Sequence, residues 1–451
     1  MSAASTGMLT LDDLRTAVAD GSIDTIVVGL VDMHGRLVGK RVSGDYFLAH
    51  FEGGIDLCNS LLTLDMESDT TPGYAMASVE LGYGDLSLRP DPSTLRRIPW
   101  HEGTALILAD AKWFDGRDVE PSPRRVLARQ IERARALGFE PVFASELEFY
   151  VCRETYDEAF RNRYATLTGT ARYVTDAHLL APGFDEELIG RLRRQLRGAG
   201  IPVETSKAEA WAGQHELTFH HGDPVAMADH HVVFKHGAKE IAEQSGCSLT
   251  FMAKPFPEWL GSSCHVHSSL WQGGVNLFAG ESELFRHYLA GQLACLRELA
   301  VFVAPNVNSY KRFVAKQATW AGNSLTWAHD NRTTGFRVLG RGPALHVECR
   351  IPGADCNPYL AFAALLAGGL DGIERELPLP EPYEGNAYVA EVERVPPTLR
   401  EAVRAFERSE LARAAFGDEV VDHYLNYARA EQRLFDAVVT DYERERMFER
   451  G

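Results

Sequence analysis

One short stretch of the chain places two carboxylates in an otherwise apolar run, Phe143-Ala144-Ser145-Glu146-Leu147-Glu148-Phe149-Tyr150. Its flanks are rich in β-forming residues, which predicts a strand. Because side chains alternate along a strand, Glu146 and Glu148 share one face, about 7 Å apart. Two such carboxylates repel each other and resist burial, and a divalent metal with oxygen ligands would relieve the repulsion. An E-x-E pattern alone is more often a solvated strand face, so the interpretation depends on further matching segments.

The composition excludes several classes of partner. A chain of 451 residues can form two or three domains with a large core. Its net charge of −17 argues against nucleic acid or an anionic membrane as partner. The seven cysteines are odd in number and contain no C-x-x-C pattern, which predicts free thiols in a reducing compartment. The longest apolar run, around residues 361–370, is too short to span a bilayer. We therefore expect a cytoplasmic enzyme.

The order of predicted elements divides the chain in two. The polar, proline-bearing segment from Asp115 to Pro123 indicates a domain boundary. Residues 1–113 are expected to form a mostly β domain, and residues 114–451 an α/β domain. Expected in the first are a helix capped by Thr10, a hairpin of residues 25–31 and 37–42, and strands at 77–81 and 104–109. Expected in the second are helices at 123–137, 225–244, 285–303 and 358–370, then two or three surface helices after Thr398.

Further segments carry acidic, histidine or arginine side chains at short spacing. Each has the same character as the Glu146/Glu148 strand, with potential ligands on one face or around one turn. They are Glu209 to Glu216, Gly261 to Ser269 with His265 and His267, Asn308-Ser309-Tyr310-Lys311-Arg312, Asn331 to Arg337, and His346-Val347-Glu348-Cys349-Arg350.

Taken in this order, the segments resemble the glutamine synthetase family over nearly the whole chain. The glutamate strand, the E-x(6)-E loop, Lys254-Pro255 followed by His265-x-x-x-Ser269, Asn-Ser-Tyr-Lys-Arg, Asn-Arg-Thr and Glu-Cys-Arg all occur in the family's order. Each piece is weak alone, but the ordered set is highly specific. The resemblance implies an α+β fold, with a β-grasp-like N-terminal domain and a catalytic α/β funnel of antiparallel strands backed by helices. It also implies a dodecamer of two hexameric rings with sites between subunits.

The resemblance implies ligands for two to three Mg²⁺ or Mn²⁺ ions. One set matches the metal that positions the glutamate carboxylate, and the other matches the metal at the nucleotide phosphates. Converging carboxylates need cations, and hard divalent ions suit oxygen ligands better than zinc, which usually takes Cys or His. The first set is Glu148, Glu209 and Glu216, and the second is Glu146, His265 and Glu348.

The resemblance also implies substrate and ATP contacts. Arg312 and Arg350 match residues that bind substrate carboxylates, a task suited to a planar two-pronged donor. Gly261 matches a glycine that contacts glutamate. The remaining matches are His267 and Ser269 at the nucleotide, and Arg332 and Arg337 at the transferring phosphate.

The implied reaction consumes ATP and L-glutamate. ATP phosphorylates the γ-carboxylate, and an amine then attacks the acyl phosphate to give a γ-glutamyl amide. Glutamine synthetases carry a flap glutamate six residues after Asn-Ser-Tyr-Lys-Arg, but Ala318 stands there in this chain. The family's Phe-Asp-Gly-Ser-Ser-Ile loop, which holds ammonium, is not recognisable either. With Ala318 bordering the substrate pocket, we predict a γ-glutamyl-amine ligase for an organic amine, a small monoamine such as ethanolamine.

Other functions stay open at this point. They are a glutamine synthetase that uses ammonium at a rearranged site, a γ-glutamylpolyamine synthetase, and a catalytically silent structural member of the family. Silence predicts eroded metal ligands, whereas all six are present. An alkylammonium costs about 4 kcal/mol to deprotonate at neutral pH, so a base is required. Glu52 and Asp56 are candidates for that base by location only.

A group of five histidines suggests a zinc site. They fall on one predicted helix and the loop before it, so we expect a solvated surface instead. They are His220, His221, His230, His231 and His236.

Overall fold

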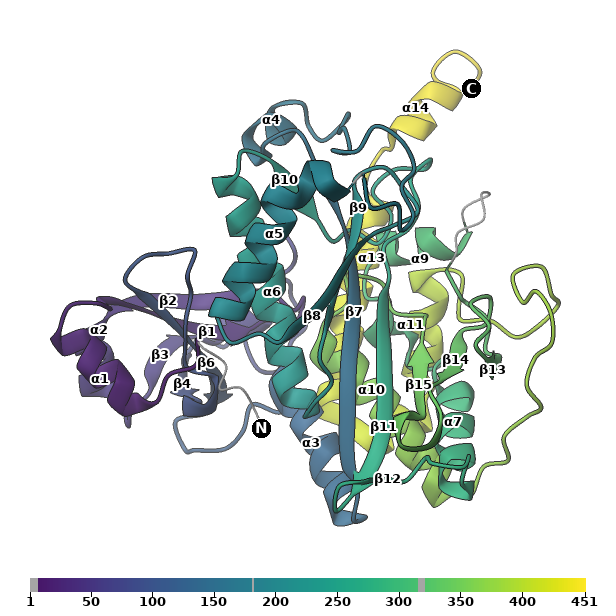
Figure 1. Ribbon diagram of the computed structural model, residues 1–451, viewed down its shortest axis with the longest axis horizontal. Helices are drawn as coiled ribbons and strands as arrows, with labels where there is room; N and C mark the ends of the chain where they lie inside the picture. The colour runs from purple at the N-terminus through teal and green to yellow at the C-terminus, as the bar shows by residue number, and fades with distance from the viewer. Residues whose placement is uncertain (1–6, 181, 315–320) are drawn as a thin grey trace.

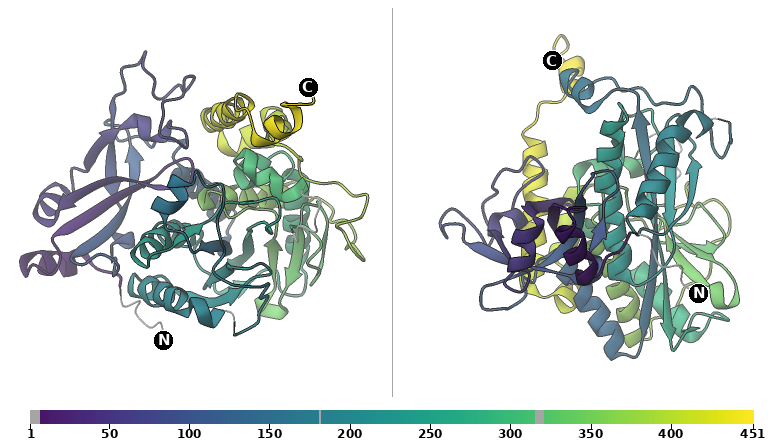
Figure 2. Two further views of the ribbon diagram at one scale, coloured as in Figure 1. Left: turned by 90° about the horizontal axis from the view of Figure 1, so that it is seen from above. Right: turned by 60° about the vertical axis from the view of Figure 1, so that its left-hand side comes forward.

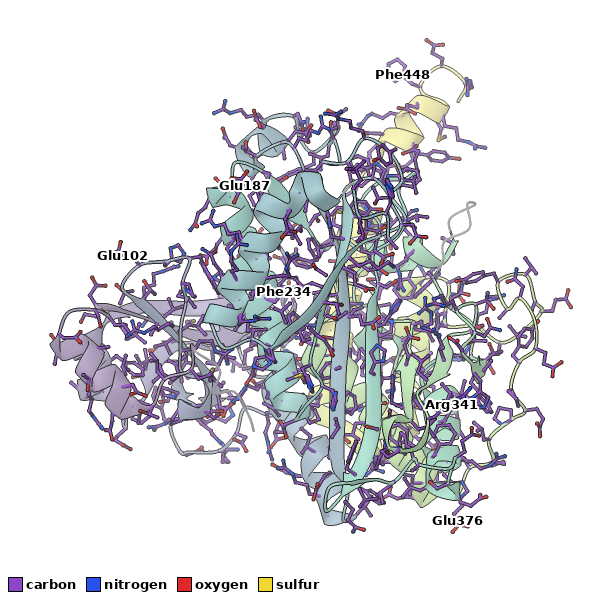
Figure 3. All side chains as sticks on the ribbon, in the orientation of Figure 1. Glu102, Glu187, Phe234, Arg341, Glu376 and Phe448 are labelled. Carbon is purple, nitrogen blue, oxygen red and sulfur yellow. The ribbon has the colours of Figure 1, made fainter. Side chains whose placement is uncertain are left out.

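The computed structural model describes residues 7–180, 182–314 and 321–451. Two sheets organise the chain, the N-terminal one in purple at the left of Figure 1 and the larger one at its centre. Phe234 lies in the interior, whereas Glu102, Arg341 and Phe448 lie at the outside (Figure 3). Among the described helices, none combines the length and the apolar character needed to cross a bilayer.

The first sheet has six strands in the order β2-β1-β6-β4-β3, with β5 paired to β6. β1 and β6 run parallel, and the other pairs are antiparallel. The predicted helix and hairpin are confirmed, and Thr10 and Asp13 cap the helix reciprocally. The elements are α1 (Leu11–Ala19), β1 (Thr25–Val31), β2 (Leu37–Ser43), α2 (Gly44–His50), β3 (Ile55–Cys58), β4 (Asp85–Pro90), β5 (Arg96–Arg97) and β6 (Thr104–Lys112).

The strand predicted at residues 77–81 is wrong, because this segment forms turns. Its larger apolar side chains have no face to bury against, with Val79 69% and Leu81 63% exposed. A strand gains its stability from packing against neighbours, so apolar residues without a partner sheet do not suffice.

β6 supplies side chains to two different cores. Ala105, Ile107 and Ala109 pack with β1 and α1 in the core of the first sheet. Leu106 and Leu108 point the other way, into the core that contains the helices of the larger part. A strand buried on both faces reads as a continuous apolar run, which explains the sequence from Thr104 onward. The left view of Figure 2 shows the purple sheet beside these helices.

The second sheet has nine strands in the order β13-β14-β15-β11-β7-β9-β8, with β10 paired to β7 and β12 to β11. Its neighbours run antiparallel except β13 and β14. Helices α3 (Pro123–Ala136), α6 (Pro224–Gln244) and α10 (Pro358–Glu374) back it (Figure 1), so the predicted α+β fold is confirmed. Its strands are β7 (Glu140–Cys152), β8 (Val203–Ala208), β9 (Gln214–Phe219), β10 (Ser248–Thr250), β11 (Cys264–Gln272), β12 (Val275–Asn276), β13 (Trp327–His329), β14 (Phe336–Leu339) and β15 (His346–Cys349).

Two helix predictions need correction. The single helix expected at 285–303 is two, because a turn at residues 296–299 lets Arg297 donate to the Arg394 carbonyl and Glu298 accept from Ser409. The segment after Thr398 forms four helices, and three of them bury apolar faces. The helices are α3 (Pro123–Ala136), α4 (Tyr156–Arg161), α5 (Pro182–Gly198), α6 (Pro224–Gln244), α7 (Glu283–Cys295), α8 (Ala300–Val303), α9 (Val307–Val314), α10 (Pro358–Glu374), α11 (Leu399–Glu407), α12 (Glu410–Phe416), α13 (Asp418–Asp436) and α14 (Asp441–Met447).

Candidate functional site

Strand register brings the predicted carboxylates and histidines together at the centre of the second sheet. Residues that lie directly opposite each other on paired strands share a face, so their side chains converge. Glu209 joins them from the turn between β8 and β9. The opposed pairs are Glu146 with His265 (β7 and β11), Glu148 with Glu216 (β7 and β9), and Glu348 with His267 (β15 and β11).

Within the described residues, three sets of side chains hold their potential ligand atoms within 4.8 Å of one another. One is the first predicted set. The second predicted set is also in contact, because Nδ1 of His265 lies 3.1 Å from Oε2 of Glu146 and 3.4 Å from Oε1 of Glu348. Each set contains at least two carboxylates, whose oxygens are the hard donors that divalent ions prefer, so each can hold a metal ion. The three sets are Glu148, Glu209 and Glu216; Glu146, Glu216 and His265; and Glu146, His267 and Glu348.

Burial and mutual repulsion leave part of this cluster short of positive charge. Burial raises the pKa of Glu148, and the charge of Glu209 raises it further. Burial likewise raises the pKa of Glu216, with Glu146 and Glu209 adding to the effect. Burial would also raise the pKa of Glu146, but its two histidine neighbours outweigh burial and lower it. The set around Glu148 is therefore the part that a divalent cation would stabilise most.

Glu348 is the centre of a guanidinium cluster. Nη1 of Arg350 lies 2.6 Å from its Oε1, and Nη1 of Arg337 lies 3.2 Å from its Oε2. Arg337 also pairs with Asp330. Burial raises the pKa of Glu348, but His265 and Arg350 outweigh burial and lower it. The ionised carboxylate therefore fixes the direction of both guanidinium groups.

Arg312 is buried, and its donors are occupied mainly by the backbone. Its Nη1 donates to the carbonyl of Ile351 at 2.7 Å, and its Nη2 donates to the carbonyl of Arg350 at 2.9 Å and to Oγ of Ser263 at 3.1 Å. Gly261 permits this position, because a Cβ there would lie 2.4 Å from Cγ of Arg312. Gly261 and Arg312 therefore form one packed unit beside the carboxylates.

Several predicted site residues lie away from this cluster. Arg332 is exposed on the turn between β13 and β14, where its carbonyl accepts a hydrogen bond from the Tyr388 hydroxyl at 3.0 Å. Glu52 and Asp56 lie in the N-terminal part, immediately before β3 and on it. Ala318 lies outside the described residues.

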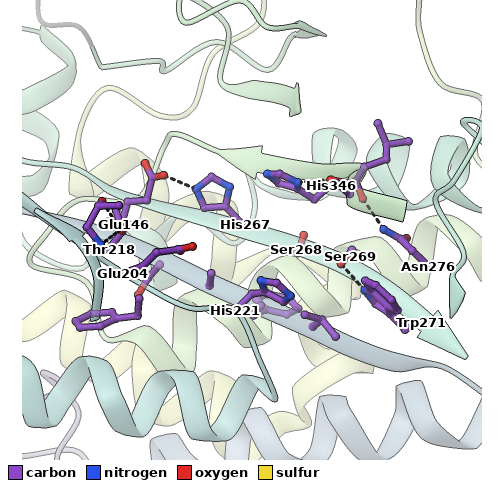
Figure 4. Close-up of a pocket in the computed structure, with 18 of the residues that line it drawn as sticks. Glu146, Glu204, Thr218, His221, His267, Ser268, Ser269, Trp271, Asn276 and His346 are labelled. Carbon is purple, nitrogen blue, oxygen red and sulfur yellow. Dashed lines mark hydrogen bonds and ion pairs between the residues drawn. The ribbon is translucent and has the colours of Figure 1, made fainter. Parts of the chain in front are cut away.

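A cavity of about 600 Å³ opens beside Glu146 (Figure 4). Both predicted nucleotide contacts, His267 and Ser269, line it. Figure 4 shows Glu146 and His267 turned toward each other, with 3.1 Å between Oε1 and Nε2. Trp271 fixes Ser269 by donating from Nε1 to its Oγ at 2.9 Å. The cavity is large enough for a small organic molecule and opens directly onto the carboxylate cluster.

Sequence reasoning missed two residues of the cluster, Gln214 and Lys207. Nε2 of Gln214 lies 3.3 Å from Oε2 of Glu148 and 3.1 Å from the carbonyl of Gly261. Nζ of Lys207 lies 2.7 Å from Oε1 of Glu209. Gln214 stands two residues before Glu216 on β9, so strand alternation was the signal that could have identified it.

The expectation of a solvated histidine surface is wrong for His231. This side chain is fully buried and contacts Oγ of Ser145 through Nδ1 at 3.2 Å. Burial lowers its pKa, and Lys235 lowers it further. His220 and His221 instead stack on each other at a ring distance of 4.6 Å outside the core. In the described part of the chain, no set of potential metal ligands includes these histidines.

Comparisons with known proteins agree on one family. Residues 120–447 match the model of the glutamine synthetase catalytic domain. The chain is 49% identical over 447 residues to a gamma-glutamylethanolamide synthetase of Streptomyces coelicolor, covering 98% of this chain and 96% of the relative. It is 37% identical over 442 residues to a glutamate–isopropylamine ligase of a Pseudomonas species, covering 95% and 96%. A solved GmaS/ADP complex superposes with a TM-score of 0.85 at 27% identity, covering 97% of this chain and 99% of the other. The chain therefore belongs to the glutamine synthetase family.

Proposed function

We propose that this glutamate–amine ligase joins the γ-carboxylate of L-glutamate to a small monoamine such as ethanolamine at the expense of ATP. The observation that carries the proposal is the 49% identity, over nearly the full length, to a relative named for γ-glutamylethanolamide synthesis. A second relative is named for joining glutamate to isopropylamine. Both names describe a small organic monoamine as the nucleophile.

The carboxylate cluster would hold two to three Mg²⁺ or Mn²⁺ ions. Its donors are mainly carboxylate oxygens with one or two imidazoles, which suits these ions better than zinc. Bound there, the ions would supply positive charge opposite the phosphate and carboxylate oxygens of the substrates. Glu148, Glu209 and Glu216 are assigned to the glutamate side, and Glu146, His265 and Glu348 to the ATP side.

We assign the cavity of Figure 4 to ATP, with His267 and Ser269 as contacts. Arg337 is held by Glu348 and Asp330, so its guanidinium is oriented before substrate arrives. Together with Arg332, it would offset charge on the phosphoryl group during transfer from ATP to the γ-carboxylate. The second step forms a C–N bond to the amine and breaks the C–O bond to phosphate, and the amine gives up a proton to a base.

Arg350 and Arg312 would serve the substrate carboxylates in different ways. Arg312 has both terminal nitrogens engaged within the protein, one of them on the carbonyl of Arg350. We therefore assign Arg350 to direct contact with a substrate carboxylate and Arg312 to holding Arg350, Ser263 and Gly261 in place. The Nε atoms of both arginines are buried without a partner in the described structure, so a donor is available next to the site.

We further propose a dodecamer of two hexameric rings in the cytoplasm, with the domain boundary at residues 113/114. The seven cysteines are free thiols, in keeping with a reducing compartment. An exposed apolar stretch at the C-terminus supports contact with another copy of the chain, since such patches mark interaction surfaces. It includes Val438, Val439, Tyr442, Met447 and Phe448.

The test is ATP- and Mg²⁺-dependent phosphate release with glutamate and a panel of amines: ammonium, methylamine, ethanolamine, isopropylamine, putrescine and spermidine. We expect ethanolamine to give the highest kcat/KM and ammonium the lowest. If ammonium were the best substrate, the protein would be a glutamine synthetase. If a diamine or polyamine were the best, the monoamine assignment would be wrong.

A variant sharpens the same assay. Ala318→Glu restores a carboxylate at the position where glutamine synthetases carry their flap glutamate. The variant is expected to raise the ratio of ammonium to ethanolamine turnover by about tenfold, the effect of roughly 1.4 kcal/mol. Ala318→Gln is the matched control, because it adds the same volume without charge and should leave the ratio near that of the parent.

A further inference from the structure

A second cavity, of about 570 Å³, borders the start of α9, the helix that carries Arg312. Its walls come from the turn between β1 and β2, from α6, from the residues after β10, and from α13. None of the metal-binding carboxylates lines it, so it is separate from the cavity of Figure 4. Its volume suits a small organic ligand.

One wall of this cavity carries two lysines, Lys235 and Lys239, one turn apart on α6. Nζ of Lys235 donates to the carbonyls of Ala354 and Cys356, at 2.9 and 3.5 Å, and lies 5.5 Å from the centre of the Phe251 ring. Within the described residues, neither lysine has a carboxylate at ion-pair distance. The positive charge of these two lysines is therefore uncompensated by the protein. The third cation of the lining, Arg36, pairs with Asp32 at 2.7 Å.

The lining also carries acids that have no ion pair within the described residues. Glu431 of α13, Asp355 and Glu67 all line the cavity. Oδ2 of Asp355 accepts from Oγ of Ser309 at 2.6 Å and from Nδ2 of Asn306 at 3.1 Å, but its Oδ1 is buried without a partner. Burial raises the pKa of Glu431, and the charges of Glu67 and Asp355 add to the effect. The negative charge of these acids is uncompensated as well.

Opposite charges thus face one cavity without pairing with each other, and one class of ligand satisfies both. We propose that the cavity binds a free amino acid as its zwitterion, with the carboxylate at Lys235 and Lys239 and the ammonium at Glu431. A simple anion would be repelled by the acids, and a simple cation would be repelled by the lysines. A zwitterion completes both sets of charges at once. Val232, Leu37 and Met252 add apolar surface for a small aliphatic side chain.

The cavity is connected to the glutamate site through α9. Asn306 and Asn308, at the start of this helix, line the cavity, and Arg312 lies one turn further along the same helix. The side-chain amide of Asn308 also binds the backbone of Lys254. Its Oδ1 accepts from the N–H of Lys254 and its Nδ2 donates to the carbonyl of Lys254, each at 2.9 Å. A bound amino acid is therefore expected to change the KM for glutamate. This kinetic consequence rests on the proposed function, whereas binding itself does not.

The test is isothermal titration with L-valine, which lacks the side-chain carboxylate that the proposed reaction phosphorylates. We expect one site per chain for L-valine. N-acetyl-L-valine lacks the ammonium and L-valinamide lacks the carboxylate, so each should bind at least about tenfold more weakly. Equal binding of either analogue would show that one charge suffices and would overturn the zwitterion assignment.

Two variants locate the site on the protein. Lys239→Met and Glu431→Gln should each weaken L-valine binding by about tenfold or more. The controls are Lys40→Met, on β2 outside the lining, and Glu419→Gln, on the exposed first turn of α13, and both should bind like the parent. A melting scan confirms that each variant is folded. Absence of L-valine binding by the parent, or binding that both cavity variants retain, would overturn the proposal, the latter because the ligand would then sit elsewhere.

Discussion

Nζ of Lys207 lies 2.7 Å from Oε1 of Glu209 and 3.8 Å from Oδ1 of Asp176. Burial lowers the pKa of Lys207, but its hydrogen bond to Glu209 and the charges of Glu209, Glu216 and Asp176 together outweigh burial and raise it. The lysine thus brings a positive charge to the edge of the Glu148, Glu209 and Glu216 set, whose acids repel each other. In the metal-free protein, it offsets part of the charge that a divalent ion would otherwise neutralise.

Lys207→Met should therefore increase the dependence of stability on metal. We expect the metal-free variant to lose about 0.5–1 kcal/mol, a modest value because the lysine side chain is 41% exposed and solvent screens the pair. The rise in melting temperature on adding Mg²⁺ should be larger than in the parent. Lys207→Arg keeps the charge and serves as control, and a smaller Mg²⁺ response in Lys207→Met than in Lys207→Arg would contradict this role.

The stability of the metal-free protein should fall as the pH rises above the ordinary carboxyl range. The folded-state pKa values of Glu148 and Glu216 are raised above the value of 4.5 for a free glutamate. The folded protein therefore holds protons that the unfolded chain has released, and this stabilisation is present at low pH and is lost as pH rises through the raised pKa values. Urea denaturation from about pH 5 to pH 8 measures the slope.

Saturating Mg²⁺ should flatten that slope, because the ion replaces the protons as the source of positive charge. Glu148→Gln should flatten it without metal. A slope that is the same with and without Mg²⁺ would show that other groups control the pH dependence.

Gly261→Ala should disturb the packed unit formed by Gly261 and Arg312. The new Cβ would lie 2.4 Å from Cγ and 2.9 Å from Cδ of the arginine, so one of them must move. We expect a loss of about 1–3 kcal/mol in unfolding free energy and a higher KM for glutamate. Gly183→Ala on α5 is the control, because its Cβ meets open space and should be neutral or stabilising. An unchanged KM for glutamate would show that Gly261 does not contribute to the glutamate site.

Arg124 of α3 joins the two parts of the molecule through three carboxylates. It contacts Asp91 at 2.6 Å, Asp110 at 2.8 Å and Asp229 at 3.0 Å, and its own side chain is 8% exposed. Removing the arginine leaves the carboxylate of Asp229, which is 5% exposed, buried without its cation, so Arg124→Met should cost about 3–5 kcal/mol. Chemical denaturation measures this loss.

Arg129→Met is the matched control on the same helix. Its ion pair with Glu120 is 38% and 31% exposed, so the loss should stay below about 1 kcal/mol. Equal losses in the two variants would mean that the Arg124 cluster adds nothing beyond a surface pair.

The sequence allowed the site to be predicted where strand alternation and order along the chain carry the information. Glu146 and Glu148 were placed on one face by alternation, and the register with His265 and Glu216 confirms that they converge with their expected neighbours. Lys207 and Gln214 follow the same two-residue spacing, but a lysine or glutamine is common on any strand. Only the three-dimensional contact distinguishes them.

Burial that depends on distant segments could not be read from local pattern. His231 was assigned to the surface because it belongs to a group of closely spaced histidines on one predicted helix and the loop before it, yet its face of α6 packs against β7 near Ser145. Residues 77–81 showed the apolar content of a strand, but whether a strand forms depends on an available sheet edge. The terminal helices were recognised as amphipathic, while their number and burial depend on the core that receives them.

The alternation of β6 has a consequence for how the molecule can be taken apart. A strand whose side chains pack in two cores cannot be separated from one core without exposing apolar surface of the other to water. The N-terminal sheet is therefore not a detachable module, even though it is a separate sheet. A fragment ending at residue 113 would expose Leu106 and Leu108 to water, and the remaining fragment would lose the cover of its own core. Expressed separately, the two pieces should aggregate, and they should recover the fold only when they are produced together.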